Sequence, residues 1–200
     1  MTPDWSKGLL PAIVQHAETG EVLMLGYMNE EALQATLDKG QVTFFSRGKQ
    51  RLWTKGESSG HVLSLSDIRL DCDADTFLVR AIPRGPTCHE GTSSCFGNDV
   101  APAQGFLGEL DALVARRAAE RPAGSYTTSL FEGGVRRIAQ KVGEEGVETA
   151  LAAVAQDDEA LLGEAADLVF HLTVLLRARG LGLADVTSVL SRRHRPPAPG

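Results

Sequence analysis

The sequence of 200 residues is long enough for one medium domain or two small ones. Hydrophobic residues make up 42% and charged residues 23%, which excludes a wholly disordered or fibrous chain. No apolar run approaches the roughly 18–20 residues of a membrane span, and the net charge of −6 lacks the basic excess of a nucleic-acid-binding domain, so we expect neither partner.

The first half of the chain predicts a strand-rich α+β domain. Asn29 followed by two glutamates is typical of a helix start, and Lys39 with Gly40 is typical of a helix end. Short β-branched or alternating runs predict strands at 42–45, 62–70 and 77–82. We expect the last two strands to form a hairpin, after which Pro and Gly residues interrupt regular structure.

The second half predicts an all-α domain. Residues 97–105 are small and polar, contain Pro and Gly, and are typical of a linker. After them apolar residues recur every three to four positions, which predicts helices at 107–114, 135–155, 160–179 and 183–191. The Pro-rich C-terminal tail is expected to be disordered. We therefore predict two domains, residues 1–100 and residues 106–195.

Three cysteines occur in the chain, and an odd number cannot form a self-contained disulfide framework. The N-terminus shows no secretory signal, so we expect a cytoplasmic protein with reduced thiols. Cys72, Cys88 and Cys95 are either inert thiols or three ligands of a zinc ion that keeps its fourth position for water, as catalytic zinc does. His89 follows Cys88 and is either a general acid or base or an ordinary loop histidine.

An acidic run surrounds the first cysteine. In an extended chain Asp71, Asp73 and Asp75 share one face and Cys72 points to the other. Three carboxylates on one face suit Mg²⁺, although a solvated acidic turn is the alternative. Because Cys72 would face away from the aspartates, we do not expect one subunit to bring all three thiols to its own aspartate face. This predicts a homodimer with zinc sites at a subunit boundary.

A basic loop from residue 47 to residue 61 combines cations, hydroxyls and glycines with one tryptophan. Cations and free backbone amides bind phosphate, and an indole can stack on a base. Such a loop is often simply solvated, but in an otherwise acidic domain phosphate binding becomes a reasonable expectation. The candidate substrate contacts are Arg47, Lys49, Arg51, Trp53, Lys55, Ser58 and Ser59.

Two predicted helices each carry acidic residues one turn apart, Glu145 with Glu148 and Glu164 with Asp167. If the helices form a hairpin around 157–159, the four carboxylates can converge. The second pair lies among apolar residues, where unpaired charge is costly and a bound Mg²⁺ would offset the repulsion. Exposed acids are the alternative. Neither helix has the Glu-x-x-His spacing of a di-iron site.

These motifs carry a resemblance to known families. Residues 53–60, 71–75 and 88–96 together resemble the phosphoribosyl-AMP cyclohydrolase family. Residues 125–127, 141–145 and 164–171 resemble phosphoribosyl-ATP pyrophosphatase, which belongs to the wider MazG-like all-α nucleotide pyrophosphatases. The order and spacing of the motifs are similar to those of the fused bifunctional enzymes of histidine biosynthesis.

The resemblance implies two consecutive hydrolyses of small nucleotides. The helical domain would cleave phosphoribosyl-ATP between its α and β phosphates, with Mg²⁺ on the four carboxylates, Glu144 as a candidate base, and Arg137 and Lys141 as phosphate contacts. The N-terminal domain would open the adenine ring of phosphoribosyl-AMP between N1 and C6 with zinc-activated water, with His89 transferring a proton. The resemblance also implies that two subunits share the zinc ligands.

Two other functions remain open at this point. One is a MazG-type nucleotide pyrophosphatase fused to a structural zinc module, which would not need the three aspartates. The other is a non-catalytic interaction protein, which would not need inward-facing carboxylates. Identifying the products formed from phosphoribosyl-ATP would discriminate among the three.

Overall fold

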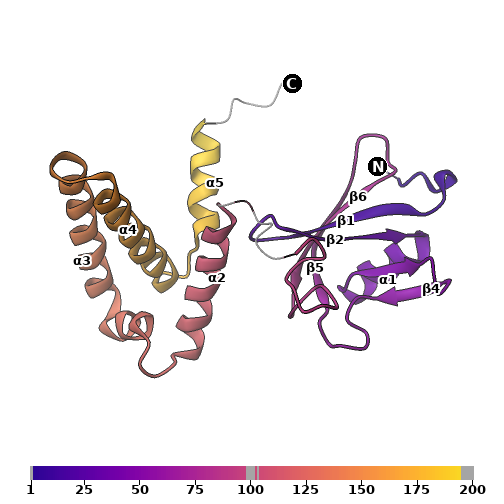
Figure 1. Cartoon of the computed structure of the whole chain (residues 1–200), viewed down its shortest axis with the longest axis horizontal. Helices are drawn as coiled ribbons and strands as arrows, with labels where there is room; N and C mark the ends of the chain where they lie inside the picture. Colours follow the sequence, from indigo (N-terminus) through magenta and orange to yellow (C-terminus); the bar gives the residue numbers. More distant parts are fainter. Residues whose placement is uncertain (1, 98–101, 103, 195–200) are drawn as a thin grey trace. The chain divides into compact units, whose positions relative to one another are not determined.

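The computed structural model describes residues 2–97, 102 and 104–194, and it divides the chain into two compact units, Met1–Phe106 and Leu107–Gly200. The first unit is strand-rich and the second is helical (Figure 1), which confirms the expected fold class. Most of the expected linker and the expected disordered tail lie outside the described residues. None of the helices in the described ranges is both long and apolar enough to cross a membrane.

The N-terminal unit is built on a four-stranded sheet with the order β2-β1-β6-β5, in which β1 and β6 are parallel and the other neighbours antiparallel. A second sheet pairs β3 with β4. The elements are the 3-10 helix η1 (Trp5–Lys7), β1 (Leu10–His16), β2 (Val22–Met28), α1 (Glu30–Lys39), β3 (Thr43–Ser46), β4 (Arg51–Thr54), β5 (Leu63–Leu70) and β6 (Phe77–Pro83).

Several predicted elements of this unit are confirmed. The side chain of Asn29 accepts a hydrogen bond from the backbone N–H of Ala32 at the start of α1, and the helix ends at Gly40 with a φ of 62°. The hairpin of β5 and β6 is also present. Strands β1, β2 and β4 were not predicted. Apolar residues of β1, β2 and β6, together with Phe44 of β3, form most of the buried core.

The acidic run does not have the expected conformation. Residues 71–75 form the turn between β5 and β6, so the prediction of an extended chain is wrong. Asp71 Oδ1 accepts hydrogen bonds from the backbone N–H groups of Asp75 (3.0 Å) and Thr76 (3.2 Å), and Ala74 has a φ of 62°. An aspartate that satisfies nearby backbone N–H groups favours a turn over a strand. The alternation argument for a shared zinc site therefore fails.

The second unit contains α2 (Gly105–Glu120), α3 (Tyr126–Ala155), α4 (Asp158–Ala178) and α5 (Leu183–His194). A kink at Gly134 divides α3, and the expected helix 135–155 is the part after the kink. Helices α3 and α4 lie side by side as the expected hairpin, and Asp157 caps the start of α4 (Figure 1). Asp111 of α2 pairs with Arg177 of α4, with oxygen to nitrogen distances of 2.6 and 2.7 Å.

Candidate active sites

A cavity of about 510 Å³ in the N-terminal unit is lined by the loop after β4 and the loop after β6. This volume is within the range of small-molecule sites. Seven of the residues predicted from the sequence line it, namely Trp53, Lys55, Ser58, Ser59, Cys88, His89 and Cys95. The structure therefore brings the tryptophan and hydroxyls of the basic loop together with two of the three thiols.

Sequence reasoning missed other residues of this cavity, including Glu57, His61 and Thr87. His61 is exposed at the end of the basic loop, and two glycines lie close to it. A Cβ at Gly85 would lie 2.8 Å from its imidazole, and a Cβ at Gly56 would lie 2.4 Å from its backbone carbonyl carbon. Larger residues at these two positions would therefore crowd His61.

The cations of the basic loop separate into two groups. Lys55 is only 8% exposed, and desolvation lowers the pKa of its ammonium, which donates a hydrogen bond to the His61 carbonyl (3.3 Å). Arg47 and Lys49 lie in the turn between β3 and β4, and Arg51 lies at the start of β4; none of the three lines the cavity. Arg51 is paired with Glu57 at 2.6 Å.

Two of the thiols form a pair. Cys88 and Cys95 lie close enough for each thiol to shift the pKa of the other, and Cys88 Sγ lies 3.8 Å from His89 Nδ1. Hydrogen bonds from the Glu90 backbone and from the Thr92 hydroxyl lower the pKa of the Cys88 thiol, which favours the thiolate that binds metals. This pair is suited to a soft cation such as Zn²⁺.

Cys72 does not join this pair. It lies in the turn before β6, whereas Cys88 and Cys95 lie in the loop after β6. A strand of seven residues is about 20 Å long, and the backbone N–H of Cys95 is bonded to Leu23 on the edge strand β2. Within the described parts of the chain the three thiols do not form one ligand group. One chain therefore offers two of the three predicted zinc ligands at one place.

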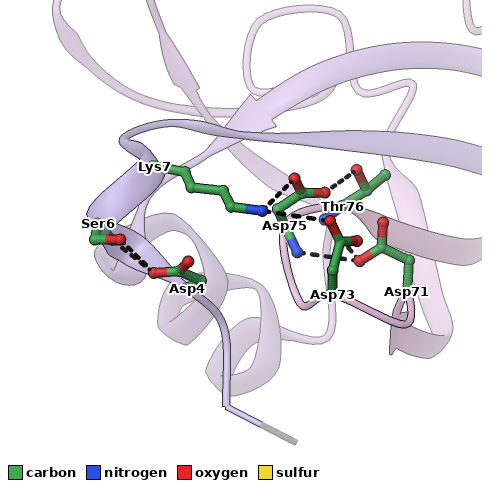
Figure 2. Close-up of polar contacts among 7 residues, drawn as sticks. All are labelled: Asp4, Ser6, Lys7, Asp71, Asp73, Asp75 and Thr76. Atoms are coloured by element: carbon green, nitrogen blue, oxygen red, sulfur yellow. Dashed lines mark hydrogen bonds and ion pairs between the residues drawn. The ribbon is translucent and has the colours of Figure 1, made fainter.

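The three aspartates do converge, although they lie in a turn. Carboxylate oxygens of Asp71, Asp73 and Asp75 lie within 4.8 Å of one another. Figure 2 shows Lys7 reaching these carboxylates from η1, with its Nζ 2.8 Å from Asp75 Oδ2 and 3.3 Å from Asp73 Oδ2. The hydrogen bond between Lys7 and Asp75 raises the pKa of the lysine and lowers that of the carboxyl group, so both stay charged near neutral pH.

The ammonium of Lys7 supplies positive charge to the aspartates, and an all-oxygen donor set of this kind fits Mg²⁺. No local pattern predicts this contact, because Lys7 precedes the aspartates by more than sixty residues. The N-terminal segment is fixed there by a second bond, from the Asp4 backbone N–H to the Ala74 carbonyl at 2.8 Å.

The helical unit contains the second carboxylate cluster. Oxygens of Glu145 on α3 and of Glu164 and Asp167 on α4 lie within 4.8 Å of one another, and Glu145 is buried. Desolvation, followed by the charges of Glu145 and Glu164, raises the pKa of Glu148, so this fourth carboxylate interacts with two of the three. A bound cation would offset the repulsion among these acidic residues, and their oxygens fit Mg²⁺.

A lysine borders this cluster. Lys141 Nζ lies 2.9 Å from Glu144 Oε2 and 3.0 Å from Glu145 Oε1. Hydrogen bonds from Lys141 and Gln140 lower the pKa of Glu144, which makes it a weaker base in this state than an isolated glutamate. Arg137 is exposed on α3, one turn before Lys141.

Both units match known family models. Residues 24–97 match the family described as phosphoribosyl-AMP cyclohydrolase, and residues 107–194 match phosphoribosyl-ATP pyrophosphohydrolase. The first range contains the cavity, the thiols and the aspartates, and the second contains the helical carboxylates. The chain is therefore an enzyme that joins two hydrolase domains.

Close relatives have the same two-domain length. The chain is 68% identical over 196 residues to the histidine biosynthesis bifunctional protein HisIE of Xanthomonas axonopodis pv. citri, covering 97% of this chain and 94% of that protein. It is 60% identical to the protein of the same name from Escherichia coli, covering 96% and 95%. The chain belongs to this bifunctional family, which confirms the resemblance predicted from its motifs.

Proposed function

We propose that the helical domain, residues 106–195, hydrolyses phosphoribosyl-ATP to phosphoribosyl-AMP and pyrophosphate, and that the N-terminal domain, residues 1–100, then opens the adenine ring between N1 and C6. The observation that carries this proposal is that one matched family range contains a pair of thiols and an aspartate cluster, whereas the other contains a cluster of carboxylates alone. The substrates are small nucleotides, and the proposed location is the cytoplasm, where free thiols such as these stay reduced.

In the helical domain, Glu145, Glu148, Glu164 and Asp167 would hold Mg²⁺. The ion, when bound, supplies positive charge that neutralises the polyphosphate and positions water. Lys141 bridges two glutamates and can turn toward a substrate phosphate, with Arg137 as a second cation one helical turn away. Once Lys141 leaves Glu144, the pKa of that carboxylate returns toward its ordinary value and it can accept the proton of the attacking water.

In the N-terminal domain, Cys72, Cys88 and Cys95 would hold Zn²⁺, and the three aspartates of the β5–β6 turn would hold Mg²⁺. Zinc, when bound, supplies a Lewis acid that lowers the pKa of water toward neutrality. His89 would move the proton to the departing ring nitrogen. Trp53 offers its indole face to the base, and Lys55, Ser58 and Ser59 offer donors to the phosphate. Arg47, Lys49 and Arg51 remain predicted contacts for phosphate outside the cavity.

The active form would be a homodimer in which Cys72 of one subunit completes the zinc site of the other. The separation of Cys72 from the Cys88–Cys95 pair within one chain supports this arrangement. This support does not depend on residues 71–75 being extended. An exposed apolar stripe on α3 supports a dimer independently. Val147, Leu151 and Val154 recur at helical spacing and are 60%, 54% and 82% exposed. A second copy of the chain would cover this stripe.

Supplying phosphoribosyl-ATP to the pure protein with Mg²⁺ and Zn²⁺ tests the function directly. We expect pyrophosphate together with a ribonucleotide whose purine ring has been opened. Accumulation of phosphoribosyl-AMP by a zinc-loaded protein would support instead a pyrophosphatase fused to a structural zinc module. No turnover of either nucleotide would contradict both catalytic assignments.

A further inference from the structure

A buried histidine lies beside the helical carboxylates and is not used by the proposed mechanism. The side chain of His171 on α4 is 4% exposed. Its Nδ1 lies 2.8 Å from the backbone carbonyl oxygen of Asp167 and 3.6 Å from Glu145 Oε1. The Asp167 carbonyl is at hydrogen-bond distance and accepts from the Nδ1–H, whereas Glu145 Oε1 lies beyond that distance, and Nε2 is left as an acceptor.

A tyrosine from the other helix completes this arrangement. Tyr126 Oη lies 3.0 Å from His171 Nε2, and its O–H group is the donor that this nitrogen requires. The Tyr126 ring also stacks on Phe170, with ring centroids 6.2 Å apart. Tyr126 is in the part of α3 that precedes the kink at Gly134, whereas Glu145 follows the kink. The imidazole therefore connects the two parts of α3 through α4.

The position of the imidazole matters for the carboxylate beside it. Glu145 Oε1 lies 3.0 Å from Lys141 Nζ and 3.6 Å from the Nδ1 atom of the His171 imidazole. A carboxylate among other carboxylates tends to turn away from them, because like charges repel. The buried His171 imidazole, held at Nε2 by Tyr126 and at Nδ1 by the Asp167 carbonyl, limits this motion on its side of Glu145. In many metal sites, residues that contact a ligand without touching the metal orient that ligand.

We infer that His171, held by Tyr126, is a positioning residue that orients Glu145 toward the divalent cation of the pyrophosphohydrolase site. This inference rests on the proposed metal site of the helical domain. His171 and Tyr126 need not touch the nucleotide in this role. Their loss is expected to weaken metal binding first, and the loss of hydrolysis follows from it.

The test measures binding of Mn²⁺ alone to the full chain by titration calorimetry. The titrated protein carries Asp73→Asn and Asp75→Asn, so that the aspartate cluster of the N-terminal domain does not contribute to the measured heat of Mn²⁺ binding. In this background His171→Leu is expected to raise the Mn²⁺ dissociation constant about tenfold. Tyr126→Phe keeps the ring stack and removes one hydroxyl, and we expect a rise of about threefold. His171→Asn keeps a donor near the Nδ1 position and is expected to recover most of the affinity.

Controls distinguish positioning from a structural role. Tyr27→Phe, which removes a tyrosine hydroxyl from the N-terminal unit, should leave Mn²⁺ binding unchanged. Pyrophosphate release by Tyr126→Phe in the otherwise native chain should fall at limiting Mn²⁺ and recover at saturating Mn²⁺, whereas its metal-free melting temperature should match that of the native chain. A structural role would lower the melting temperature, and excess metal would not restore the rate.

Unchanged Mn²⁺ affinity in Tyr126→Phe and in folded His171→Leu would overturn the inference. If His171→Leu does not fold, Tyr126→Phe decides alone, because it alters a single hydroxyl. Normal pyrophosphate release by the native chain, with no effect of either variant, would reject the positioning role and leave the proposed function intact. Variant effects on Mn²⁺ affinity without any pyrophosphate release by the native chain would support positioning and reject the function.

Discussion

Lys7 Nζ lies 2.8 Å from Asp75 Oδ2, so a side chain near the N-terminus supplies a positive charge to the aspartate turn (Figure 2). The same ammonium is 3.3 Å from Asp73 Oδ2. A divalent cation bound by these aspartates would need the same oxygens. We therefore expect Lys7 to compete with such an ion for these oxygens.

Replacing Lys7 with methionine should strengthen metal binding at the aspartate turn. In an Asp167→Asn background, which silences the helical site, Lys7→Met is expected to bind Mn²⁺ about two- to fivefold more tightly, since exposed ion pairs contribute little. Titration calorimetry measures the change, and Lys39→Met, on α1, is the matched control. Weaker binding by Lys7→Met would show that the ammonium organises the aspartates instead of competing for them.

The two activities should separate by mutation. Glu148→Gln removes a proposed magnesium ligand and should reduce pyrophosphate release by more than about 100-fold, while added phosphoribosyl-AMP is still ring-opened. Cys88→Ser should do the reverse, because zinc is lost and phosphoribosyl-AMP accumulates. Both reactions are measured on each variant at matched folded content. A folded variant that loses both activities would contradict two independent sites.

His89→Ala should slow ring opening without releasing zinc. The expected loss is about 10²–10⁴-fold, the range for a positioned proton-transfer group. Zinc content is measured by elemental analysis on the same sample as the rate. Zinc loss in His89→Ala would assign the imidazole to metal binding, which its Nδ1 position 3.8 Å from Cys88 Sγ also permits.

Shared zinc ligation can be tested by mixing two inactive variants. Cys72→Ser and Cys88→Ser are each expected to bind no zinc and to lack ring-opening activity. If Cys72 acts on the partner subunit, a mixed dimer contains one intact site, because one chain still supplies Cys72 and the other still supplies Cys88 and Cys95. Zinc content and activity should then return on mixing, up to half of the sites in each mixed dimer. No recovery after proven subunit exchange would place all three thiols in one chain.

The metal-free protein should gain stability when Glu148 is neutralised. Desolvation and the neighbouring carboxylates raise the pKa of Glu148 above its ordinary value of 4.5. The ionised form is therefore less favourable in the folded chain than in the unfolded one. This lowers the free energy of unfolding as pH rises through the folded pKa, and has no effect well below 4.5.

Glu148→Gln should thus melt at a higher temperature than the native chain at pH 7 and at the same temperature at pH 3.5 to 4, both without metal. Scanning calorimetry in the presence of a chelator measures this difference. Glu159→Gln, at the exposed start of α4, should show no comparable gain. A lower melting temperature for Glu148→Gln at pH 7 would mean that the ionised carboxylate is stabilised in the fold.

The residue patterns alone predicted the two kinds of domain and most of their chemistry. The spacing of three places Glu145 and Glu148, and likewise Glu164 and Asp167, on one helix face, because the α-helix has a fixed period. The capped helix at Glu30–Lys39 and the β5–β6 hairpin also follow from local signals. Such features depend on backbone geometry within a few residues.

Tertiary structure decided which distant groups meet. Three contacts join segments that are far apart in the sequence. They are the pairing of Lys7 with Asp75, the contact of Tyr126 with His171 and the parallel register of β1 and β6. The separation of Cys72 from the other thiols depends on the length of β6 and on the attachment of Cys95 to β2. Local periodicity carries no information on these contacts, because they form only when burial of the apolar faces brings the segments together.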